Sequence, residues 1–96
     1  MDKFTKRLME LSDLEEGQRR KELNHSPPTE CDICGAGFGD SLFFIDGRRM
    51  NSLMWANMCP RCFFEGGAGL GCGDGQLYMK QANGEWLMTA GFWEEN

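Results

Sequence analysis

The apolar residues near the start of the chain follow a helical period. They recur every three or four positions with charged residues between them, at Phe4, Leu8, Leu11 and Leu14. This spacing is typical of an amphipathic helix with one apolar stripe. We therefore expect an N-terminal amphipathic helix over residues 1–24, whose stripe packs on the rest of the chain, on a partner protein or against a second copy in a homodimer.

Polar residues indicate where this helix begins and where it is interrupted. Asp2 is of a type that caps helix starts, and Ser12-Asp13 can cap a restart. Gly17 weakens a helix interior by about 1 kcal/mol relative to alanine. The sequence predicts one helix with a break near Gly17.

A different pattern follows a proline-containing linker at residues 25–30, where a helix cannot continue. Residues 42–45 predict a short strand, and Asp46-Gly47 predicts a tight turn that sends residues 48–50 back. Residues 53–58 form a further apolar segment.

The last third of the chain contains a second hairpin pattern. Residues 77–80 and 85–88 are apolar runs on either side of an Asn83-Gly84 turn signal. Together these patterns divide the chain into the helix, the linker and three further parts. We expect a zinc-binding domain over residues 31–80, a C-terminal hairpin extension over residues 81–93 and a tail over residues 94–96.

Two cysteine pairs carry the strongest chemical signal. Cys31 and Cys34 form one C-x2-C pair, and Cys59 and Cys62 form the other. Two intervening residues allow a tight turn to direct both sulfurs of a pair at one ion, and thiolates suit a tetrahedral d¹⁰ metal. The sequence predicts one structural Zn²⁺ held by these four residues. Because they complete the coordination shell, no catalysis is assigned to the metal.

Three other interpretations of the pairs remain open. They could be unrelated structural thiols, a redox dithiol or ligands of an iron–sulfur cluster. A redox motif expects a strand immediately before it, and the proline-rich linker before Cys31 does not supply one.

Length and charge fit a metal-stabilised domain. The chain has 96 residues with a formal net charge of −5, which allows one domain with a modest core. The acidic balance argues against a freestanding polyanion binder. The chain shows no signal-peptide pattern and no apolar run that could span a bilayer. We therefore expect a cytoplasmic protein with reduced thiols and no membrane association.

Other reactive features are weaker. Cys72 lies among glycines and the single histidine, His25, lies in the linker, so a catalytic thiol is not expected. The glycine-rich run at residues 66–75 lacks a phosphate-loop pattern, and we interpret it as a close-packed loop wrapping the zinc module.

Aromatic and basic residues leave two kinds of partner open. The chain has many aromatic residues for its size, and some of them, such as those at Phe92-Trp93, are expected on the surface. Exposed aromatics on an acidic protein favour a protein partner. Arg48, Arg49 and Arg61 could cluster beside the zinc site and bind nucleic acid, which is the less favoured alternative.

Several motifs together resemble small zinc-ribbon proteins encoded by bacteriophages and prophages. The resemblance covers residues 31–80 and rests on Cys31-Asp-Ile-Cys34-Gly35, on the approach to Cys59-Pro-x-Cys62, and on the Gly-x-Gly-x-Gly-Gln-x-Tyr run that ends at Tyr78. Because that family is mostly of unknown function, the resemblance implies a phage-related setting in a bacterial cytosol rather than an activity.

These observations predict a small α+β zinc-binding domain, of zinc-ribbon or treble-clef-like type, with an N-terminal amphipathic helix. A helical turn after Cys59 would favour the treble clef, and a second knuckle would favour the ribbon. The expected function is that of a non-enzymatic accessory protein that binds a host or phage protein as an adaptor, inhibitor or regulator.

Overall fold

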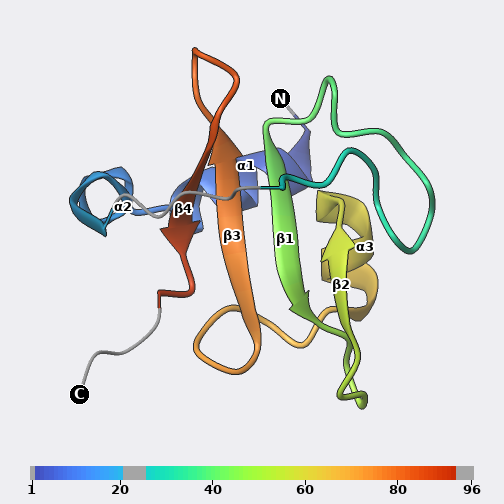
Figure 1. Cartoon of the computed structure of the whole chain (residues 1–96). Helices are drawn as coiled ribbons and strands as arrows, with labels where there is room; N and C mark the ends of the chain where they lie inside the picture. Colours follow the sequence, from blue (N-terminus) through green and yellow to red (C-terminus); the bar gives the residue numbers. More distant parts are fainter. Residues whose placement is uncertain (1, 21–25, 93–96) are drawn as a thin grey trace.

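An antiparallel sheet of four strands forms the centre of the fold, with two helices on one of its faces and a third beside one edge (Figure 1). This architecture is seen in a computed structural model that describes residues 2–20 and 26–92. The expected α+β class is confirmed. In chain order the elements are α1 (Lys3–Leu11), α2 (Leu14–Arg20), β1 (Phe43–Arg48), β2 (Trp55–Met58), α3 (Pro60–Gly66), β3 (Gly75–Lys80) and β4 (Trp86–Ala90).

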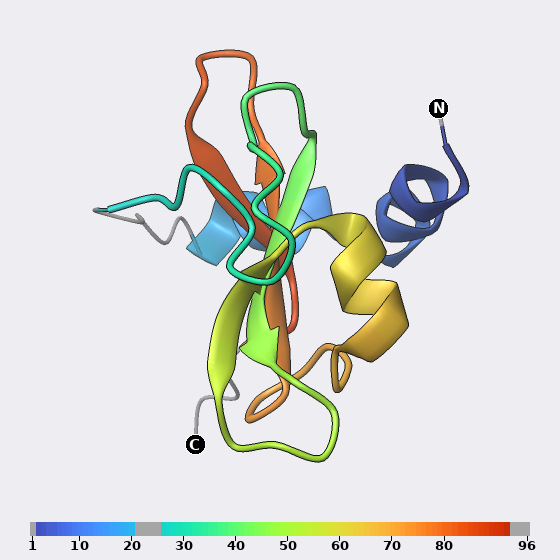
Figure 2. The same cartoon turned by 90° about the vertical axis from the view of Figure 1, so that its right-hand side faces the viewer.

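The sheet has the strand order β2-β1-β3-β4, so β1 and β3 are central. Ile45 of β1 lies opposite Met58 of β2 and Leu77 of β3, and all three are fully buried. Figure 2 shows α1 and α3 on one face of this sheet. Because side chains alternate along a strand, Phe43 and Ile45 share one face, and Phe44 belongs to the other.

The second face of the sheet carries an aromatic cluster. Phe44 stacks on Tyr78 with ring centroids 4.8 Å apart and meets Trp86 edge-on at 4.7 Å. Phe38 stacks on Phe44 from the segment before β1, at 5.5 Å. Pro27 lies beside this cluster, so the linker before the first cysteine pair passes over this face of the sheet.

The N-terminal segment contains two helices instead of one, and the break is not at Gly17. Asp2 caps α1 as expected, accepting a hydrogen bond from the Thr5 amide at 2.8 Å. The restart is at Ser12–Asp13, where Asp13 caps α2 by accepting from the Glu16 amide at 2.9 Å. Gly17 lies buried inside α2, because that helix approaches β4 closely there.

The apolar stripe of the first helix is divided between core and surface. Leu8 is fully buried, and Phe4 stacks on Phe64 of α3 at 5.4 Å. Leu11 and Leu14 remain exposed. The stripe therefore packs on the chain itself through its first half.

The predicted turn at Asp46-Gly47 is wrong, because both residues lie inside the continuous strand β1. A Cβ atom on Gly47 would come within 3.0 Å of the Asp74 carbonyl oxygen and 3.1 Å of the Gly75 Cα. The glycine therefore serves a close approach of two backbones. The hairpin turns later, where Asn51 adopts a φ of 60°.

The C-terminal hairpin is present, and it extends the sheet. β3 and β4 pair in antiparallel fashion, and Gly84 adopts a φ of 87° in the turn between them. The expected boundary between a domain at 31–80 and an extension at 81–93 stays a prediction. The expected helix end at 21–24, His25, Trp93 and the tail at 94–96 lie outside the described residues.

Over the part of the chain that the structure describes, no helix is both long enough and apolar enough to cross a membrane.

Candidate metal centre

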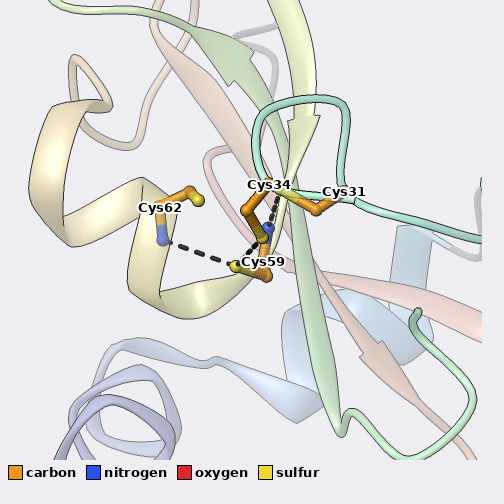
Figure 3. A group of neighbouring side chains, drawn as sticks. All are labelled: Cys31, Cys34, Cys59 and Cys62. Atoms are coloured by element: carbon orange, nitrogen blue, oxygen red, sulfur yellow. Dashed lines mark hydrogen bonds between the residues drawn. The ribbon is translucent and has the colours of Figure 1, made fainter. Parts of the chain in front are cut away.

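The structure brings together the four cysteines predicted as ligands. The sulfur atoms of Cys31, Cys34, Cys59 and Cys62 all lie within 4.8 Å of one another. Figure 3 shows their side chains converging between the turn that precedes β1 and the start of α3. Around a tetrahedral ion with metal–sulfur bonds of about 2.3 Å, sulfurs lie about 3.8 Å apart. The Sγ atoms of Cys34 and Cys59 are separated by 3.8 Å.

A tight turn presents the first pair of sulfurs. The Gly35 amide donates to the Cys31 carbonyl at 2.9 Å, and the Cys31 amide donates to the Ala36 carbonyl at 2.8 Å. Gly35 has a φ of 80°, a left-handed conformation that residues with a Cβ rarely adopt. The glycine after the second cysteine is therefore required by the backbone of this turn.

Asp32 fastens this turn to the edge strand of the sheet. Its amide donates to the Asn57 carbonyl at 2.8 Å, and its carboxylate accepts from the Asn57 amide at 2.8 Å. Asn57 is in β2, directly before Met58 and Cys59. These two hydrogen bonds hold the first cysteine pair beside the second.

The second pair opens helix α3. Cys59 is the N-cap residue, and its sulfur accepts a hydrogen bond from the Cys62 amide at 3.5 Å. Pro60 follows in the first turn, where its missing N–H leaves no helical bond unmade. Cys62 therefore projects from the first turn of the helix toward the same point as Cys59.

Burial and hydrogen bonds shift the pKa values of the cysteine thiols in opposite directions. Burial raises the pKa of the Cys59 and Cys62 thiols. Burial also acts to raise the pKa of Cys31, but backbone amides of Cys34, Cys59 and Ile33 outweigh it and lower the pKa to about 7. Two of these amides donate to the Cys31 sulfur, from Cys59 at 3.3 Å and from Ile33 at 3.4 Å. Such donors stabilise thiolates around a metal.

The cluster can hold one metal ion with sulfur at all four corners. Cys31 and Cys62 are buried, Cys59 is partly buried and Cys34 is exposed. A four-thiolate shell leaves no position for water or substrate, which is typical of structural sites. The arrangement is compatible with the expected structural zinc, which would link the turn, the sheet edge and α3.

Two carboxylates, those of Asp46 and Asp32, lie near the cysteine cluster. Asp46 is in β1 opposite Asn57. Partial burial raises the pKa of Asp46, and the charge of Asp32 raises it further. Negative charge therefore accumulates on this side of the β1–β2 hairpin.

The other sequence candidates are not part of the centre. Cys72 is an exposed free thiol in the turn between Gly71 and Asp74, and His25 lies outside the described residues. The glycine-rich loop does not wrap the metal cluster as expected. It packs on the end of the β1–β2 hairpin that lies away from the cysteine cluster. There the Ala68 amide donates to the Arg48 carbonyl at 2.9 Å.

The arginines considered for nucleic-acid binding are held by neighbouring groups. Arg48 forms an ion pair with Asp74 at 2.8 Å, and Arg61 forms one with Glu65 at 3.3 Å. The Arg49 guanidinium lies against Gly66 at the end of α3. Two of the three positive charges are therefore balanced within the fold.

Sequence reasoning missed two features that the structure shows. One is that Asp32 holds the first cysteine turn to β2. The only sequence signal for this role was the position of Asp32 inside the C-x2-C turn. The other is the loop between β1 and β2, where residues 53 and 54 do not belong to a strand. The signal there was a run of adjacent apolar residues without the alternation of a half-buried strand.

Comparison of the chain with models of known protein families, with curated proteins and with solved structures gives no match. The chemistry of the centre therefore rests on its own residues.

Proposed function

We propose that this chain is a non-enzymatic accessory protein of phage type that binds a host or phage protein and is stabilised by one structural Zn²⁺. One observation carries the proposal. Several large apolar side chains are exposed, and half of those on the described surface gather in the β1–β2 loop and at the first residue of β2, namely Met50, Leu53, Met54 and Trp55. Such concentration of apolar surface on a small acidic protein is typical of a protein-binding site.

Zinc is the metal that this donor set favours. Four thiolates form a soft, tetrahedral shell, and the cytosolic setting expected from the sequence keeps them reduced. A turn with the first pair, a hairpin, and a helix that begins with the second pair follow one another along the chain. This order supports the treble-clef-like alternative over the zinc ribbon, because the second pair opens a helix.

The proposed setting is the cytosol of a bacterial host. This is the setting that the resemblance of residues 31–80 to phage-encoded zinc proteins implies, and reduced cysteines fit it, because all five are free thiols. In that setting the protein acts by occupying a surface of its partner, as an adaptor, inhibitor or regulator.

A nuclease-controlled pull-down tests this function. The zinc-loaded chain is immobilised and exposed to lysate of the bacterial host, with and without nuclease and at two salt concentrations. We expect a discrete protein to be retained under all conditions. Retention that disappears with nuclease, and falls steeply with salt through counterion release, would instead support the alternative of nucleic-acid binding through Arg48, Arg49 and Arg61. Retention of no macromolecule would contradict both.

A further inference from the structure

The segment at residues 50–55, here called the hairpin tip, comprises the end of the β1–β2 loop and the first residue of β2, and large apolar side chains are exposed along it. Leu53 is 89% exposed, Met54 75%, Met50 59% and Trp55 44%. No residue of the hairpin tip is charged. Figure 2 shows this loop projecting at the lower end of the molecule, beyond the sheet and helices.

The backbone of the hairpin tip is held in one conformation by hydrogen bonds inside the loop. The Arg49 amide donates to the Met54 carbonyl at 3.1 Å, and the Ser52 amide donates to the Arg49 carbonyl at 3.1 Å. The Met54 amide donates to the Ser52 hydroxyl oxygen at 3.0 Å. A loop that is ordered before binding loses little conformational entropy when it docks.

Arg48 fixes the tip to the body of the protein. Its guanidinium donates to the Ser52 carbonyl at 3.1 Å and to the Asp74 carboxylate at 2.8 Å. The Met50 amide donates to the Gly66 carbonyl at 2.8 Å. The tip is therefore stiff, although its apolar side chains face solvent. Trp and Met are enriched in the buried centres of protein interfaces, and Trp is frequent among hot-spot residues.

The charges around the tip discriminate between kinds of partner. On one face of the β1–β2 hairpin, Asp46 lies opposite Asn57. Two residues further toward the tip, on the same face, Arg48 lies opposite Trp55. Asp32 is hydrogen-bonded to Asn57, so two carboxylates lie on the side of the hairpin that leads to Trp55. Arg48 is paired with Asp74, and the Arg49 guanidinium lies against Gly66, so one further positive charge lies near the base of the tip. The net charge of −5 nevertheless disfavours an anionic membrane or a nucleic acid as the partner.

We propose that the hairpin tip inserts into an apolar cleft of the partner protein, and that lysine or arginine side chains at the rim of that cleft face Asp46 and Asp32. This assignment rests on the proposed function and names the surface and the chemistry of the partner. Leu53, Met54 and Trp55 supply the buried contact area. The two carboxylates set the orientation and speed the encounter through charge complementarity.

Site-specific photo-crosslinking tests this assignment in the full zinc-loaded chain. In three separate proteins, a benzophenone amino acid replaces Leu53 at the tip, Glu85 in the exposed β3–β4 turn, or Leu11. Leu11 lines a groove between α1 and α3, together with Phe63 and Phe64. Each protein is irradiated in cells of the bacterial host. We expect a discrete adduct with another protein from position 53 and none from position 85.

Two matched variants probe the contact in the position-53 protein. Met54→Asp places a charge in the proposed cleft, and we expect the adduct to fall about tenfold or more. Asn83→Asp adds the same charge to the exposed turn of the other hairpin, and we expect no change. Both sites are exposed, and circular dichroism with metal analysis verifies that both variants fold. Asp46→Asn should also reduce the adduct, more at low salt than at high salt.

The outcomes separate this assignment from the proposed function. A protein adduct from position 11 or 85 but not from 53 would overturn the role of the hairpin tip and leave protein binding intact. An adduct with lipid or with a second copy of the chain, or an adduct unchanged by Met54→Asp, would also overturn it. Absence of a protein adduct at all three positions would contradict both proposals.

Discussion

At the residue scale, Gly17 shows how packing on the sheet overrides helix propensity. A Cβ atom at this position would lie 2.5 Å from the Met88 carbonyl oxygen. Gly17→Ala gains about 1 kcal/mol of helix propensity, but the clash costs about 1–3 kcal/mol. We expect the variant to unfold at a lower urea concentration than the parent chain.

Gly39→Ala is the matched control for this substitution. A Cβ atom there meets no atom within 4 Å, and we expect an unchanged or slightly higher urea midpoint. A Gly17→Ala chain that is more stable than its parent would show that α2 is not seated against β4.

The thiol pKa values make metal binding depend on pH. Because burial raises the pKa of Cys59 and Cys62, both are protonated at pH 7 in the metal-free chain, and binding must release both protons. Each released proton raises the apparent affinity about tenfold per pH unit. We expect the apparent zinc affinity to rise at least about 100-fold per unit near pH 7.

Cys31 adds to this dependence at lower pH. Its pKa of about 7 means that it becomes protonated as the pH falls below neutrality, so a third proton must then leave. Calorimetric titration with zinc in buffers of different ionisation enthalpy measures the number released. Release of fewer than two protons at pH 7 would contradict the assignment of Cys59 and Cys62 as thiolate ligands.

At the scale of elements, α1 is attached to the fold through one buried residue. Leu8 is fully buried, whereas Leu14, at the start of α2, is 43% exposed. We expect Leu8→Ala to reduce the free energy of unfolding by about 2–5 kcal/mol, and Leu14→Ala to change it by less than about 1 kcal/mol. Denaturant titration of the zinc-loaded variants measures both. Equal effects would show that α1 is not docked on α3.

The elements also show where local signals and tertiary contacts disagree. The apolar period of residues 4–14 correctly predicts helix, because residues three or four positions apart share one face of a helix. Asp46-Gly47 predicts a turn because that pair is common in tight hairpins, but in this fold Gly47 lets β1 and the start of β3 approach closely. A local motif cannot distinguish these uses of glycine, since the neighbouring backbone comes from a distant part of the chain.

At the scale of the whole molecule, the candidate metal centre lies where three parts of the fold meet. It links the turn before β1 to the edge strand β2 and to the start of α3. Binding of a structural zinc contributes on the order of 10 kcal/mol to folding, which is comparable to the whole stability of a small domain. Loss of the ion should therefore unfold this side of the molecule.

Substitution of a buried ligand tests this role. Cys62→Ser removes one thiolate, and we expect the purified chain to lose stoichiometric metal and its cooperative thermal transition. Cys72→Ser changes the exposed cysteine in the glycine-rich loop, and we expect full metal content and an unchanged transition. Elemental analysis and circular dichroism provide the readouts. A Cys62→Ser chain that binds one equivalent of metal and melts as before would contradict the four-cysteine centre.

The sequence by itself determined the N-terminal helix start, the last hairpin and the four candidate ligands, because helix caps, Asn-Gly turns and C-x2-C spacings act over a few neighbouring residues. Only the tertiary structure decided that the helix breaks at Ser12–Asp13 and not near Gly17, that β1 continues through Gly47 and that the hairpin tip is exposed. Those features depend on which distant backbone or side chain lies next to the segment. The sequence pattern around an apolar residue such as Leu53 does not show whether that residue is buried or faces solvent.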